Sequence, residues 1–100
     1  MRCIHNTSFI VDENAVREWV EFVKGEYIPS ISRLELCDDI LLTKVSIDQP
    51  EGKTYSLQLV FSSPEKMDEY LAAHMARIDA PLIEKFRNRY LCFNSVLSEI

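Results

Sequence analysis

The stretch Thr54–Phe61, Thr-Tyr-Ser-Leu-Gln-Leu-Val-Phe, constrains the fold of this chain most, because large apolar side chains recur in it at every second position. A strand turns successive side chains to opposite faces. One face therefore carries Tyr55, Leu57, Leu59 and Phe61, and the other carries Thr54, Ser56, Gln58 and Val60. The first set predicts a packed core face, whereas the second is apolar only at its end. We expect any function on that second face.

The N-terminal residues 3–11 alternate in the same way and predict a first strand. Phe9 and Val11 mark its core face, so Asn6 and Ser8 belong to the opposite face. A helix is expected next. Its apolar side chains recur at helical spacing along one stripe, which is typical of a helix packed on a core.

This first helix is expected over about residues 13–27, with Trp19 as a core residue of its stripe. Pro29 lacks an amide donor and crowds the preceding turn, so it permits at most a kinked further turn through residues 30–34. A second strand is predicted over residues 40–47, which are rich in aliphatic and β-branched side chains. The turn residues that follow it predict a hairpin with the Tyr55 strand.

A second helix has a clear start signal, with Ser63 as N-cap and Pro64 at the first helical position. Pro81 is expected to kink or divide this helix, so that Asp79 or Ala80 starts a second piece. Residues 91–97 form the last predicted strand. The order strand, helix, strand, strand, helix, strand is that of a ferredoxin-like α+β fold.

Residues 1–100 are thus expected to form a single ferredoxin-like βαββαβ domain, a size that supports one hydrophobic core. Right-handed crossovers place both helices on one face of a four-stranded antiparallel sheet. The first and third strands are then central neighbours. Their open faces bring together four polar residues, which we regard as the candidate ligand-binding residues: Asn6, Ser8, Ser56 and Gln58.

Either Asn94 or Ser95 joins this polar group, depending on the register of the last strand. Aliphatic side chains such as Ile4, Ile10 and Val60 surround it, so the face is too apolar for water and too polar for an ordinary core. A second copy of the chain is expected to cover it. The resulting homodimer is of the dimeric α/β-barrel type, with a partly polar cavity between the two sheets.

Composition argues against several partners. The chain has 11 basic and 16 acidic residues and a net charge of −5, which disfavours nucleic acid and anionic membranes. The polar central positions also lack the aromatic platform of RNA-recognition sheets. No apolar run is long enough for a membrane span and no signal core is present, so a cytoplasmic location is expected.

No metal or cofactor site is expected from the local spacing of ligands. Cys3, Cys37 and Cys92 are odd in number and far apart, which indicates reduced thiols rather than a disulfide framework or a zinc knuckle. His5 falls on the core side of the first strand, and neither His74 nor a carboxylate is placed beside it by local spacing. Structural roles are therefore expected for these side chains.

Several segments together are similar to a small bacterial family of unknown function, whose members are free-standing domains of about this length. The resemblance implies the same ferredoxin-like, dimeric barrel fold and brings no activity. That family has His-Ile-Pro where this chain has Tyr27-Ile28-Pro29. The matching segments are His5-Asn6-Thr7-Ser8-Phe9, Glu18-Trp19, Phe22-Val23-Lys24, Tyr27-Ile28-Pro29, Gly52-Lys53-Thr54-Tyr55-Ser56-Leu57-Gln58, Tyr70 with His74, and Phe86 with Phe93.

A second resemblance concerns Asn6 and His74. In antibiotic-biosynthesis monooxygenases and their heme-degrading relatives on this fold, an asparagine of the first strand and a histidine of the second helix serve the active site. Asn6 and His74 resemble those positions, and the resemblance implies that His74 is a candidate catalytic residue or an axial heme ligand. The alternative is that His74 flanks an apolar helix face and Asn6 satisfies a partner across the sheet.

Three hypotheses follow. The first is a homodimeric small-molecule-binding or interaction module, because amide and hydroxyl groups orient a ligand but supply no good nucleophile or general base. The second is a monooxygenase of the antibiotic-biosynthesis type, and the third is a purely structural dimer. The position of His74 separates the first two hypotheses, because catalysis requires that it reach the cavity.

Overall fold

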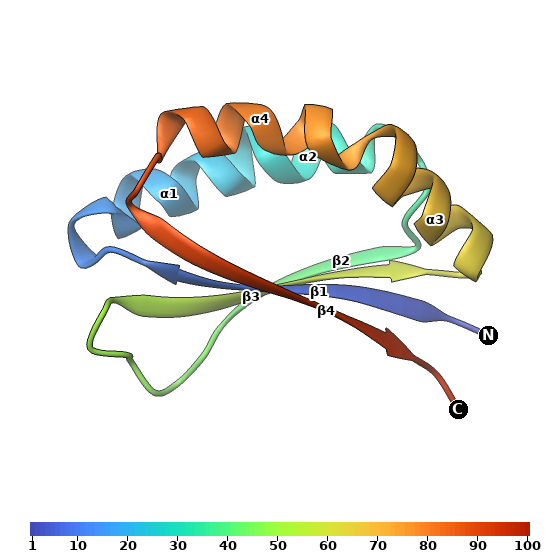
Figure 1. Ribbon diagram of the computed structural model, residues 1–100, viewed down its shortest axis with the longest axis horizontal. Coiled ribbons are helices and arrows are strands. Elements are labelled where there is room, and N and C mark those ends of the chain that lie inside the picture. Colours follow the sequence, from blue (N-terminus) through green and yellow to red (C-terminus); the bar gives the residue numbers. More distant parts are fainter.

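Four antiparallel strands form one sheet with the order β2-β3-β1-β4 in the computed structural model, which describes residues 1–100. All helices cover one face of this sheet, and the other face is open (Figure 1). The predicted ferredoxin-like α+β fold is confirmed. The strands are β1 (Cys3–Val11), β2 (Asp39–Lys44), β3 (Lys53–Phe61) and β4 (Tyr90–Ser98).

The central strands β1 and β3 pair directly, as the strand order predicts. Asn6 lies opposite Gln58 and Ser8 lies opposite Ser56. The β1 side chains alternate between buried and half-buried along the whole strand, which is the pattern of a strand with one covered face.

The first helical layer is longer than residues 13–27. A 3-10 turn (Glu13–Ala15) leads into α1 (Val16–Phe22), a π-helical segment (Val23–Tyr27) and then α2 (Ile28–Ser32). Ile28 N–H donates to the carbonyl of Val23, five residues earlier, and Pro29 follows in the first turn of α2. The wider π turn keeps the path helical although Pro29 has no amide to donate.

The second helical layer divides at His74 and not at Pro81. Ser63 caps α3 (Pro64–Ala73) as predicted, accepting a hydrogen bond from the Lys66 amide at 3.4 Å. His74, with φ −127° and ψ −32°, separates α3 from α4 (Met75–Lys85), which contains Pro81. The expected new start at Asp79 or Ala80 was wrong. Pro81 is exposed, so water can solvate the carbonyl that loses its amide partner.

Strand β2 ends at Lys44 instead of continuing to Ile47. Val45 still donates to the Thr54 carbonyl at 2.9 Å, and the chain then leaves the sheet. In the loop, Asp48 pairs with Lys44 at 2.9 Å and with Lys53 at 3.3 Å, so that charge pairs replace the strand ladder. The loop extends beyond the open face of the sheet (Figure 1).

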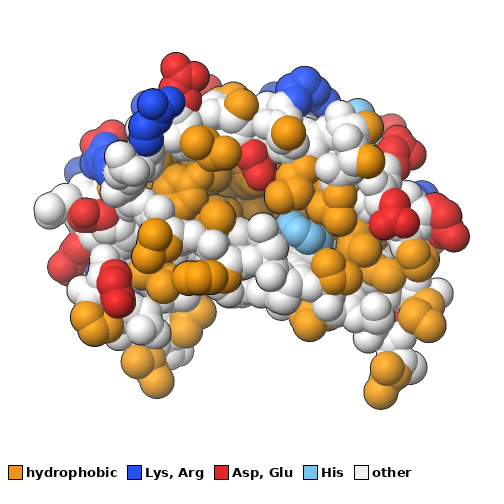
Figure 2. Space-filling model, in the orientation of Figure 1, with side chains coloured by type: hydrophobic (Ala, Val, Ile, Leu, Met, Phe, Trp, Pro, Cys, Tyr) orange, Lys and Arg blue, Asp and Glu red, His pale blue; other side chains and the backbone are white.

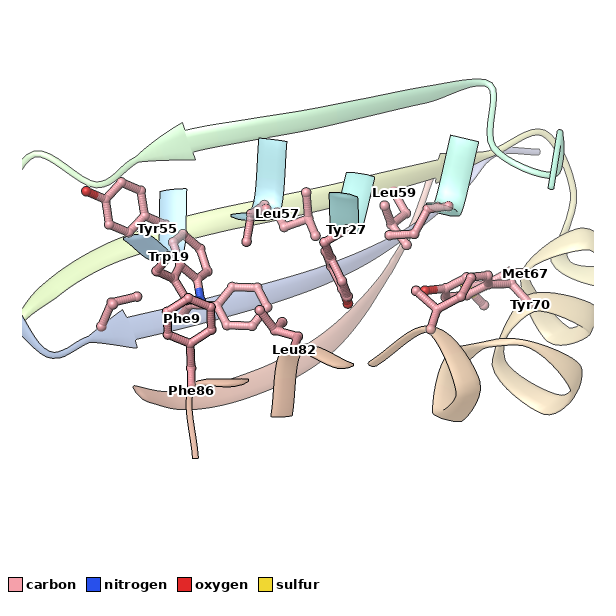
Figure 3. Packing of buried hydrophobic residues seen from close by; sticks show 14 of the residues in the cluster. Phe9, Trp19, Tyr27, Tyr55, Leu57, Leu59, Met67, Tyr70, Leu82 and Phe86 are labelled. Atoms are coloured by element: carbon pink, nitrogen blue, oxygen red, sulfur yellow. The ribbon is translucent and has the colours of Figure 1, made fainter. Parts of the chain in front are cut away.

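Aromatic residues dominate the core between the sheet and the helices (Figure 3). The Trp19 ring is fully buried, and its centroid lies 5.1 Å from those of both Phe9 and Tyr55. Its core role is therefore confirmed. The Trp19 Nε1 hydrogen has no acceptor, so this side chain contributes to folding through its ring rather than through a hydrogen bond.

Candidate functional site

The open face brings together the four polar residues predicted from the sequence. Ser56 Oγ donates to Asn6 Oδ1 at 2.7 Å, and Asn6 Nδ2 donates to Ser95 Oγ at 3.4 Å. The register places Ser95 on this face, because Ser95 lies opposite Asn6. Asn94 points to the helical side and accepts from Thr7 Oγ1 at 2.9 Å. Asn6, Ser56 and Ser95 thus bond to one another, and the group offers amides and hydroxyls without a general base.

Large apolar side chains border the polar group on the open face. Leu41, Leu91, Phe93 and Leu97 are 44%, 55%, 61% and 45% exposed. The pairing with β1 and β3 places all four on the same side of the sheet as Asn6 and Ser56. These side chains lie on the two edge strands, β2 and β4, so apolar surface is exposed on both sides of the polar group.

His74 lies away from both the open face and the sheet core. Its Nδ1 is 2.9 Å from Arg77 Nη2, and its Nε2 is 3.9 Å from Glu69 Oε2. Asn6 turns its side chain to the other face of the sheet, so the structure does not bring Asn6 and His74 together. His74 belongs to a polar cluster at the junction of α3 and α4.

Sequence reasoning missed a second site, a small cavity between the helices and the sheet, which we call the inner cavity. Its volume is about 70 Å³, and it is the most enclosed hollow of the molecule. Figure 2 shows a hollow on the side of α4 and β4, bordered by hydrophobic side chains. Its lining residues are His5, Thr7, Phe9, Tyr27, Leu57, Leu59, Tyr70, Met75, Asp79, Leu82, Ile83, Tyr90 and Cys92.

Asp79 is the charged group of the inner cavity. Tyr27 donates its hydroxyl hydrogen to Asp79 Oδ1 at 2.5 Å, which is at the short end of the range for a hydroxyl bound to a carboxylate. The other oxygen, Oδ2, has no hydrogen bond from the protein. Burial raises the pKa of Asp79, while the Tyr27 hydrogen bond and the nearby His5 oppose this rise. Because Asp79 is half-buried, its second oxygen is accessible and has unused hydrogen-bonding capacity beside a largely apolar space.

The other polar groups of the cavity are held in neutral forms. His5 is 5% exposed, and burial lowers its pKa, so its ring is uncharged at neutral pH. Burial also raises the pKa of Tyr27 and Tyr70, and it raises that of Tyr90 to about 12. The tyrosine hydroxyls therefore keep their hydrogens, and that of Tyr27 is already donated to Asp79. Figure 3 shows Tyr27 and Tyr70 between the sheet and the helices.

A wider groove lies along α3 and α4 outside the inner cavity, and we call it the outer groove. Its volume is about 470 Å³, and Met75, Asp79 and Ile83 line both spaces. Asp79 thus sits where the two spaces meet. The outer groove is lined by Leu71, Met75, Ala76, Asp79, Ala80, Ile83, Glu84 and Arg87.

The sequence contains a weak indication that α4 turns a charged residue toward this site. Met75, Asp79 and Ile83 are spaced four residues apart, so they share one helix face on which Asp79 is the only charged member. An acidic residue within an apolar stripe indicates a polar group turned toward a covered space. Because a helix start was expected at Asp79, these three residues were not predicted to share one helix face.

The residues of the inner cavity do not fit a metal or a heme. No group of three or more His, Cys, Asp or Glu side chains in the chain is arranged to hold a metal ion. A porphyrin is far larger than a cavity of about 70 Å³, and the candidate axial ligand His74 is not among its lining residues. Burial also raises the pKa of the Cys92 thiol, which leaves it a weak nucleophile.

The comparisons with known proteins concern the fold and the family. A family model described as a domain of unknown function, DUF4286, matches residues 2–100. A comparison of the sequence with curated proteins gives no match.

No helix of the structure is both long enough and apolar enough to cross a membrane.

Among solved structures, SnoaB from Streptomyces nogalater, a cofactor-independent oxygenase, is similar with a TM-score of 0.71 at 14% identity, over 98% of this chain and 92% of that one. A NIPSNAP family protein from Agrobacterium tumefaciens gives a TM-score of 0.69 at 14% identity, over 100% and 94%. An antibiotic biosynthesis monooxygenase gives 0.66 at 15% identity, over 100% and 99%. At these identities the likeness concerns the fold alone.

Proposed function

Because the chain belongs to the DUF4286 family of domains of unknown function, we propose a function from its own geometry: it is a homodimeric domain that binds a small molecule beside α4. The observation that carries this proposal is the Asp79 carboxylate, which faces a largely apolar cavity and receives one hydrogen bond, from Tyr27. Ligand sites are typically apolar spaces with a few convergent polar groups. The inner cavity and the outer groove together have this character.

The homodimer is proposed from the open face. Its strand residues are uncharged except for Asp39, which lies at the start of β2. Two molecules that each carry a net charge of −5 approach most easily through such a surface. The exposed apolar side chains around Phe93 then lose contact with water.

In this dimer the polar residues Asn6, Ser8, Ser56 and Gln58 line the space between the two sheets. They retain their proposed role as groups that orient a ligand or bridging water there. The space beside α4 is the main binding site in this proposal, because it offers a charged group, whereas on the sheet Asn6 and Ser56 bond to each other.

An oxygenase is the second candidate function. The supporting observation is again Asp79, since a carboxylate whose pKa is raised by burial is better suited to accept a proton from a substrate. SnoaB, which has a similar fold, is a cofactor-independent oxygenase. A role of this kind would use Asp79 rather than His74. Consumption of dissolved oxygen with phenolic substrates, lost in Asp79→Asn, is the measurement that favours this candidate.

A native mass spectrum of gently purified protein tests the main proposal. We expect a dimer that carries extra mass, and we expect Asp79→Asn to keep the dimer while losing that mass. Asp68→Asn is the matched control, because it makes the same change at an exposed position of α3 that lines neither the inner cavity nor the outer groove. A wild-type monomer at micromolar concentration refutes the dimer. Extra mass that is retained in Asp79→Asn refutes the proposed site.

A further inference from the structure

We propose that the ligand of this site is an amphiphilic amine, whose cationic head binds Asp79 in the inner cavity and whose apolar body lies in the outer groove. This inference rests on the proposed function, since it names the ligand class of the same site. It follows from the charge balance around Asp79, the aromatic lining of the cavity and the sizes of the two spaces.

The charge balance leaves Asp79 without a cationic partner. The ion pairs of the chain join Arg2 to Glu99, Arg17 to Glu21 and Asp48 to two lysines, and none of them includes Asp79. Within the inner cavity, His5 is the one basic side chain, and burial keeps it neutral. Asp79 is half-buried. A partly desolvated carboxylate without a counter-charge is less stable than a solvated one, and a cationic ligand relieves this cost.

The walls of the cavity favour a cation over a neutral donor. The rings of Phe9, Tyr27, Tyr70 and Tyr90 all line the inner cavity. The face of an aromatic ring carries partial negative charge and attracts an ammonium group. A carboxylate in a cavity that aromatic rings also line discriminates an amine from an alcohol of the same shape, because the carboxylate acts on the positive charge and the rings can add to this attraction.

The sizes of the two spaces determine how the ligand lies. The inner cavity, at about 70 Å³, admits little more than the head group, whereas the outer groove measures about 470 Å³. The floor of the groove is apolar and includes Leu71, Met75 and Ile83. A ligand with an amine at one end and a hydrocarbon body fits this arrangement.

Two matched probes test this assignment, hexylamine and 1-hexanol, which share the same hydrocarbon body. Each is titrated into ¹⁵N-labelled protein, and the amide shifts of Met75, Asp79 and Ile83 report on binding at the site. We expect hexylamine to bind wild type about tenfold or more tightly than hexanol, the factor that corresponds to one hydrogen bond to a charged group. Asp79→Asn should remove this preference, while Asp68→Asn, at an exposed position of α3 that lines neither space, should retain it.

The possible outcomes separate this inference from the proposed function. If both probes shift the amides of α4 and bind with equal affinity, the amine assignment is refuted but the proposed binding site is retained. No shift at α4 with either probe at millimolar concentration refutes both. The comparison of the two probes on the wild-type protein tests the amine assignment even if Asp79→Asn folds poorly. The amide spectrum of the variant shows whether it is folded.

Discussion

Ser56→Asp is the substitution that tests the homodimer most directly. Ser56 lies on the central strand β3, and its hydroxyl is 2.7 Å from Asn6 Oδ1 in the middle of the open face. No basic side chain lies on the strands of this face to pair with a new carboxylate. In a dimer packed sheet to sheet, each copy contributes one such carboxylate to the buried contact.

The expected effect is large because the charge is both buried and unpaired. An unpaired ion in a protein interior costs several kcal/mol after relaxation and water entry. Two copies of the substitution should therefore weaken the dimer by about 5 kcal/mol or more, which raises its dissociation constant by more than roughly a thousandfold. Folding of the monomer should be retained, because the open face of a free monomer is hydrated.

Sedimentation equilibrium over a range of protein concentrations measures this effect. Ser32→Asp is the matched control, because it adds the same charge at an exposed position at the end of α2, on the helical side of the sheet. We expect Ser32→Asp to remain dimeric where Ser56→Asp is monomeric. A Ser56→Asp protein that is still dimeric at micromolar concentration would show that the interface lies elsewhere on the molecule.

Three further predictions concern stability, each measured by urea unfolding. Tyr27→Phe removes the donor to Asp79 and should lower the free energy of unfolding at neutral pH by about 1.5–3 kcal/mol, and an unchanged value would show that the bond contributes little. Gly52 has φ +153°, and Gly52→Ala would place a Cβ 2.0 Å from the Val11 carbonyl oxygen. This substitution should lower the free energy of unfolding by roughly 2–5 kcal/mol. A loss below about 1 kcal/mol would contradict this geometry. His5 has a lowered pKa in the folded state, so the unfolded state binds its proton more readily, and stability should fall as the pH drops below about 6.5. His5→Gln should reduce that loss relative to wild type, and an identical pH profile would refute the assignment.

Much of the fold was predictable from residues close in sequence. The alternation in residues 54–61 and 3–11 gave both central strands with the correct faces, and Ser63 with Pro64 gave the start of α3. These signals are local, since a strand alternates and a helix begins within a few residues of backbone. The break at His74 had no such signal, because no proline or glycine marks it and Pro81 is accommodated within α4.

The sequence by itself determined the strand order and the polar group on the open face, including Asn6 and Ser56, because strand period and crossover handedness follow from local geometry. Only the tertiary structure decided that Asp79 of α4 meets Tyr27 of the π-helical segment beside His5 of β1. These residues are far apart in the chain, and their contact depends on the rotation of each helix over the sheet. That rotation is decided by how the whole core packs, and no short stretch of sequence encodes it.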